Sequence, residues 1–86
     1  MLKLLLLEFM GIILILSTSI LTHSNPYFIG LAYMSALLIS HESPGHFNPI
    51  FLFMQYLLGR IPVNEFLKFL SIQLLAVIGF VIAYKY

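Results

Sequence analysis

Three long stretches of almost unbroken apolar residues run along the chain, separated by short polar segments. This pattern predicts helices over residues 4–22, 27–41 and 64–84. A helix rises about 1.5 Å per residue, so roughly 20 apolar residues cross a hydrocarbon core of about 30 Å. The first and last stretches reach that length, and the second is shorter. The pattern therefore predicts helices that cross a membrane.

The segment 42–58 differs from the others, because a polar loop leads into a short apolar run. Pro44-Gly45 breaks any helix. Asn48 is a good N-cap and Pro49 suits a first helical position, which predicts a short helix over Ile50–Leu58. Nine residues span roughly 14 Å, about half of the hydrocarbon core. Such a helix either lies flat on the membrane or re-enters it, and its apolar character on all sides favours the re-entrant arrangement.

Composition strengthens the membrane assignment. Apolar residues make up 62% of the chain and charged residues only 8%, whereas an ordinary soluble domain is about a quarter charged. A soluble domain of 86 residues could not bury this much apolar surface. The net charge of +1 is too small for a nucleic-acid-binding surface. The absence of cysteine excludes disulfides and thiolate metal sites.

The few charges predict an orientation. With three crossings and a re-entrant segment, Lys3, Arg60 and Lys68 fall on one side of the membrane and Lys85 on the other. The positive-inside rule then places the N-terminus on the cytoplasmic or equivalent side. A basic start before an apolar run is also typical of a signal peptide, but Glu8 opposes that interpretation.

Three stretches resemble the aquaporin, or major intrinsic protein, family, in the order in which the family has them. Glu8-Phe9-Met10-Gly11 is similar to its first-helix signature, Glu-x-x-Gly. Ser43-Pro44-Gly45-His46-Phe47-Asn48-Pro49 is similar to its Ser-Gly-x-His-x-Asn-Pro-Ala loop. Gly59-Arg60-Ile61-Pro62, followed by Gln73-Leu74-Leu75, is similar to its link into the third helix. The match covers nearly the whole chain but only the first of the family's two inverted repeats. The other Asn-Pro pair, Asn25-Pro26, is interpreted as a turn.

The resemblance implies an all-α membrane protein with three transmembrane helices plus one re-entrant half-helix, a half-aquaporin-like fold. It implies that Glu8 braces the loop through backbone N–H groups, and that Phe28 lies at the family's aromatic narrowing. In the half-helix motif, loop carbonyls and an asparagine amide line the path of water and a histidine lies in the vestibule. The residues of that motif here are Gly45, His46, Phe47, Asn48 and Pro49.

The sequence also departs from the family. Ile50 stands where the family has alanine, and the second repeat has no counterpart in this sequence. His41, Glu42 and His46 do not make a metal motif, because a metal-binding helix needs histidines four positions apart without a break. No catalytic residue, metal or cofactor is predicted. The residues expected at helix–helix contacts are Gly11, Gln73 and Gly79.

Two functions fit these observations. The first is an aquaporin-like half-repeat acting as a small structural or accessory membrane subunit of a larger assembly, without independent conduction and without enzymatic activity. The alternative is a channel for water or small neutral solutes, formed by an antiparallel homodimer or with a partner subunit. Bulky helix faces and the missing repeat favour the first. The expected partners are the lipid bilayer and other membrane protein subunits, with no nucleic acid, and a hetero-assembly is favoured over a homodimer. The excess of Leu, Ile and Phe suggests an organelle or viral membrane.

Overall fold

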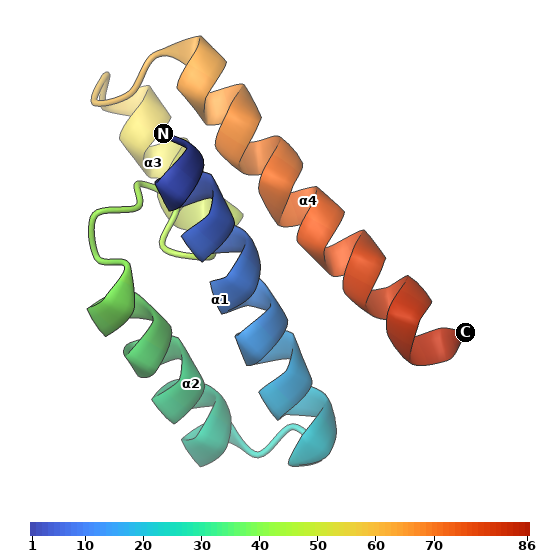
Figure 1. Cartoon of the computed structure of the whole chain (residues 1–86). Coiled ribbons are helices and arrows are strands. Elements are labelled where there is room, and N and C mark those ends of the chain that lie inside the picture. The colour runs from blue at the N-terminus through green and yellow to red at the C-terminus, as the bar shows by residue number, and fades with distance from the viewer.

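The computed structural model describes all 86 residues as four α-helices joined by loops, with no β-strand (Figure 1). The helices are α1, Leu2–Leu21; α2, Pro26–Ile39; α3, Pro49–Leu57; and α4, Val63–Lys85. Each helix begins and ends within two residues of the bounds that the apolar pattern predicts.

Two Asn-Pro pairs start the second and third helices in the same way. The Asn25 side-chain oxygen accepts a hydrogen bond from the Tyr27 backbone N–H, and the Asn48 oxygen accepts one from Ile50, both at 2.9 Å. In each pair the proline takes the first helical position, where its missing N–H loses no bond. The interpretation of Asn25-Pro26 as only a turn is therefore wrong, because this pair caps and opens α2.

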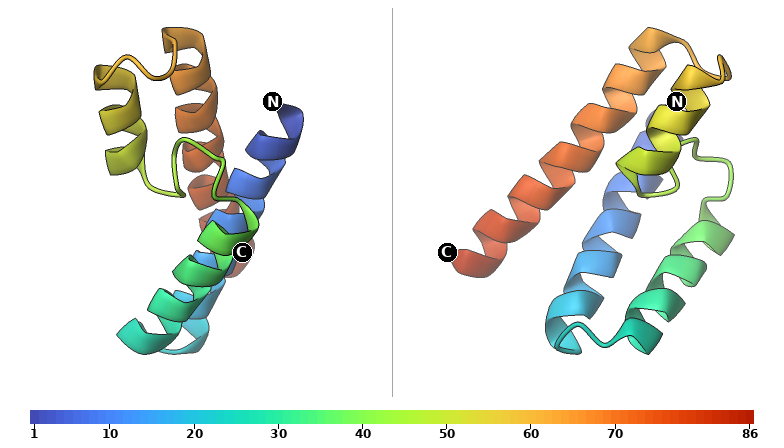
Figure 2. Two further views of the ribbon diagram at one scale, coloured as in Figure 1. Left: turned by 90° about the vertical axis from the view of Figure 1, so that its left-hand side faces the viewer. Right: turned by 180° about the vertical axis from the view of Figure 1, so that it is seen from behind.

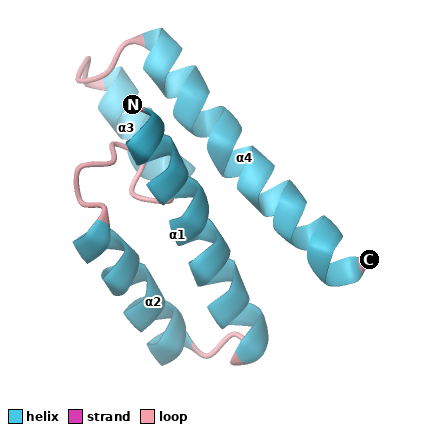
Figure 3. Cartoon of the chain, in the orientation of Figure 1, coloured by secondary structure: helices cyan, strands magenta, loops and turns pink.

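Helix α1 is central, since it contacts both α2 and α4. Helix α3 packs against α4, and the turn between them lies at the same end of the molecule as the N-terminus (Figure 2). Helices α2 and α3 both run towards the end of the molecule that carries the N-terminus, and the α2–α3 loop turns back between them (Figure 2). The loop is the longest connection between helices, and it lies beside α1 (Figure 3).

Two small apolar clusters hold the helices together. The first joins α1, α2 and α4 to the α2–α3 loop, and consists of Ile12, Ala36, Phe47 and Ala76. The second joins α3 to α4, and consists of Leu52, Phe66 and Phe69. The alanines in the first cluster keep the contacts on α1 short, as small residues do between closely packed helices.

The two glycines expected at helix contacts differ in their surroundings. The Phe47 ring occupies the space in which a Cβ atom at Gly11 would lie. At Gly79 no atom of another part of the chain lies within 4 Å of that position. Gly11 therefore gives Phe47 its place against α1, whereas Gly79 packs against no other helix of this chain.

Two of the helices, α1 with 20 residues and α4 with 23, are long and apolar enough to cross a membrane. Helix α2 is apolar but has only 14 residues. Only 14 of the 86 residues are buried, and large apolar side chains are exposed on all four helices. Exposed apolar surface of this extent is typical of faces that contact lipid or other proteins.

Replacing Gly11 by alanine is expected to destabilise the protein, although alanine is the better helix former, because the new methyl group must displace the Phe47 ring. The expected loss is about 1–3 kcal/mol in the free energy of unfolding, measured by denaturant titration in detergent micelles. The matched control is Gly79→Ala, which gains up to about 1 kcal/mol from helix propensity alone. Equal effects of the two variants would contradict the close contact at Gly11.

Candidate functional site

The most unusual feature of the interior is the carboxyl group of Glu8, in the second turn of α1. Its exposed fraction is 0%, and it accepts three hydrogen bonds. The Phe47 backbone N–H donates to Oε1 at 2.9 Å, and the Gln73 side-chain amide donates to the same oxygen at 2.8 Å. The Ser43 hydroxyl donates to Oε2. One side chain thus connects α1, the α2–α3 loop and α4.

The loop reaches Glu8 because Gly45 leaves room for it. A Cβ atom at Gly45 would lie 2.5 Å from the Glu8 Oε1 atom and 2.6 Å from the Gln73 Nε2 atom. The positive φ angles occur at the next two residues, 45° at His46 and 61° at Phe47. Since non-glycine residues seldom adopt this region, the surrounding contacts must fix the backbone there.

Phe47 supplies much of that constraint. Its backbone N–H is held by Glu8, and its buried ring lies in the cluster beside Gly11. The Tyr33 ring meets it edge-on, with ring centroids 6.2 Å apart. The Tyr33 hydroxyl then donates to the His46 carbonyl oxygen. The backbone of His46 and Phe47, with its positive φ angles, is therefore held by Glu8 of α1 and by Tyr33 of α2.

Two of the loop carbonyls that the resemblance implies along a water path accept hydrogen bonds within the chain. The Gly45 carbonyl accepts the Asn48 backbone N–H at 2.8 Å, and the His46 carbonyl accepts the Tyr33 hydroxyl. The Asn48 side-chain oxygen caps α3. These groups thus build the loop and begin the helix that follows it.

Some buried polar atoms have no hydrogen-bond partner in the chain. They are Ser40 Oγ, His46 Nδ1 and Gln73 Oε1. The His46 ring lies edge-on to Phe51, with centroids 5.6 Å apart. Gln73 is only 4% exposed, its amide nitrogen donates to Glu8, and the residue lines a cavity of about 130 Å³.

The remaining candidates lie away from this cluster. Phe28 is in the first turn of α2, 52% exposed, at the end of the helix opposite the loop. Gly79 lies in the last part of α4. His41 and Glu42 are exposed, and no group of three or more His, Cys, Asp or Glu side chains comes together anywhere in the chain. The structure therefore gathers Glu8, Gln73 and the loop motif but not Phe28.

Two participants were not singled out from the sequence. Ser43 appeared only as part of a motif, yet it occupies the second oxygen of Glu8. Tyr33 belongs to no motif, and its one sequence signal is its position three residues before buried Ala36, which puts it on the same face of α2.

Searches among protein families, curated proteins and solved structures find no match to this chain.

Replacing Glu8 by leucine is expected to abolish stable folding. The change leaves the Ser43 hydroxyl, the Phe47 N–H and the Gln73 amide buried without an acceptor, at about 1–3 kcal/mol for each group. Glu8→Gln keeps one acceptor oxygen and should lose only part of this stability. The measurement is the free energy of unfolding in detergent, together with the yield of folded protein.

The control for this pair is Glu65→Leu in the first turn of α4, which removes a partly exposed carboxyl group of the same size. Its expected cost is at most about 1 kcal/mol, from the lost interaction with the helix dipole. If Glu8→Leu is no more destabilising than Glu65→Leu, the buried hydrogen bonds do not hold the fold.

Proposed function

We propose that the chain is a small integral membrane subunit with half of an aquaporin-like fold, which serves a structural or accessory role in a larger assembly. In this proposal α1, α2 and α4 cross the bilayer. The α2–α3 loop enters from the side of the N-terminus, and α3 returns to that side as a half-helix. The N-terminus and the α3–α4 turn face the cytoplasm or its equivalent.

The exposed surface supports insertion into a membrane. Apolar side chains cover the outward faces of all four helices, and the longest dimension of the molecule, 37 Å, exceeds the hydrocarbon core of about 30 Å. Lys3 and Arg60 lie at the end that carries the N-terminus and the α3–α4 turn, and Lys85 lies at the far end of α4. Charges at the ends and apolar residues between them suit a bilayer.

The hydrogen bonds that the α2–α3 loop makes inside the chain support a re-entrant position for it. Non-helical backbone at membrane depth persists only where protein or water satisfies its polar groups. Glu8 and Tyr33 supply such partners to Phe47 and His46.

The use of these groups favours a structural role over conduction, and this observation carries the proposal. Glu8, Ser43 and the Gly45 and His46 carbonyls all find partners inside the chain, and the Asn48 oxygen caps α3. A motif that builds a loop remains necessary whether or not water passes. The bulky exposed faces then suit packing against lipid and neighbouring subunits.

A second candidate is a path for water or small neutral solutes, completed by another copy or a partner. The observation that favours it is the pair of unpartnered atoms His46 Nδ1 and Gln73 Oε1, since a water-filled path would supply the missing hydrogen bonds.

Osmotic permeability distinguishes the two candidates. Proteoliposomes containing the wild-type chain should shrink in hyperosmotic buffer at the rate of empty liposomes. Asn48→Asp keeps a capping oxygen but removes the amide donor, and Asn25→Asp makes the same change at the start of α2. Faster shrinkage with the wild type, slowed by Asn48→Asp and not by Asn25→Asp, would support the channel and contradict the proposal.

Native mass tests the assembly directly. Solubilised from its own membrane in mild detergent, the chain should migrate in a particle much larger than a dimer, with other membrane proteins in fixed ratio. Resistance to alkaline carbonate extraction is expected first, because no peripheral contact accounts for the exposed apolar faces. A discrete homodimer would contradict the accessory role, and release by carbonate would contradict insertion into the membrane.

A further inference from the structure

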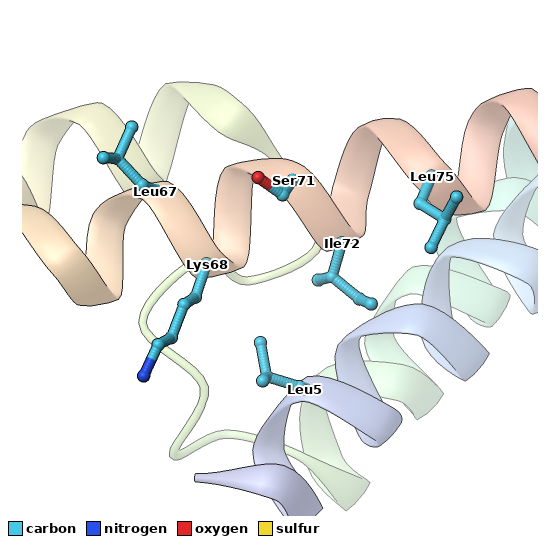
Figure 4. Close-up of a pocket in the computed structure, with 6 residues that line it drawn as sticks. All are labelled: Leu5, Leu67, Lys68, Ser71, Ile72 and Leu75. Atoms are coloured by element: carbon cyan, nitrogen blue, oxygen red, sulfur yellow. The ribbon is translucent and has the colours of Figure 1, made fainter.

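A groove between the N-terminal halves of α1 and α4 takes no part in the features described so far. Its volume is about 340 Å³, and it opens on the outer surface of the molecule (Figure 4). Its walls are mostly apolar, with one cationic and one hydroxyl group among them. The residues that line it are Leu5, Leu67, Lys68, Ser71, Ile72 and Leu75.

The polar and apolar groups of the groove follow an order along α4. Lys68 lies five residues, or roughly 8 Å, from the start of the helix, and Ser71 follows one turn later. Ile72 and Leu75 lie farther towards the middle of the helix. Beyond Ser71, towards the middle of α4, the lining residues are all apolar.

Lys68 contributes to the groove rather than pointing away from it. Its side chain extends from α4 towards the side on which Leu5 of α1 lies (Figure 4). The nearest carboxyl group on the same helix, Glu65, does not line the groove. A lysine at this depth of a membrane needs either an anion or access to the interface.

We propose that this groove binds an anionic phospholipid. The phosphate lies at the Lys68 amine, and one acyl chain follows Leu5, Ile72 and Leu75 inwards. The ligand is a lipid rather than free phosphate, because four of the six lining residues are apolar and a free anion would gain nothing from them. This inference depends on the membrane insertion in the proposed function, but not on the accessory role.

The test compares lipid retention by the full chain in nanodiscs made from equal amounts of phosphatidylglycerol and phosphatidylcholine. After gentle extraction, native mass spectrometry counts the lipids that stay bound. The wild type should retain phosphatidylglycerol in preference to phosphatidylcholine. Lys68→Gln should reduce that preference about fivefold, the effect of one basic side chain near a membrane surface. Lys85→Gln, at the opposite end of α4, should leave it unchanged.

A second variant tests the apolar half of the site without altering charge. Leu75→Trp should fill the apolar part of the groove and lower the retention of phosphatidylglycerol, although Lys68 remains. Equal loss with Lys68→Gln and Lys85→Gln, no effect of Leu75→Trp, or displacement of the lipid by millimolar inorganic phosphate would each overturn the inference.

Flotation on a density gradient separates this result from failure of the proposed function. A chain that floats with the vesicles but shows no preference for phosphatidylglycerol contradicts the lipid site alone. A chain that does not float contradicts membrane insertion, and the lipid site with it.

Discussion

The hydrogen bonds of the Glu8 carboxyl group are the interaction on which the rest of the structure depends. They join residues 35, 39 and 65 positions apart in the sequence, and they tie α1 to both the α2–α3 loop and α4. Each bond contributes only about 1–3 kcal/mol when the acceptor is charged or the site is dry. Their combined loss would release the loop, and with it the Phe47 ring from its place beside Gly11.

The same interaction explains why the resemblance of these residues to an aquaporin motif would not by itself imply conduction. Glu8, Gly45 and Asn48 each have a task inside the fold: accepting the loop backbone, leaving room for it, and capping α3. A protein that lost transport would still need all three. In the proposed assembly, the polar interior maintains the shape of the subunit, and the apolar exterior is the surface on which lipid and neighbouring chains pack.

The helices were predictable because the lengths of apolar runs and the cap chemistry of Asn48-Pro49 act locally. Asn25-Pro26 has the same chemistry and opens α2, so treating it as a turn overlooked a signal that was present. The contacts of Glu8 with Ser43 and Gln73 span too much sequence to follow from spacing. Only the resemblance suggested that Glu8 meets the loop.

Gly45 shows most clearly where local rules stop. A Pro-Gly pair correctly predicts a helix break, and glycine is the usual residue for a positive φ. Here the positive φ angles fall on His46 and Phe47, because Tyr33 and Glu8 hold their backbone groups. Glycine is required at position 45 for space instead. Such a requirement comes from side chains distant in sequence, and so becomes visible only in three dimensions.

Amide hydrogen exchange at Phe47 tests the central claim most directly. This N–H belongs to no helix, and its acceptor is the Glu8 carboxyl oxygen at 2.9 Å. The neighbouring His46 N–H has no acceptor in the structure, and serves as the internal reference. In detergent micelles observed by NMR, the Phe47 amide should exchange as slowly as the interior of α1, and far more slowly than His46. Equal, fast exchange at both residues would show that Glu8 does not hold the loop, and would contradict this account of the fold.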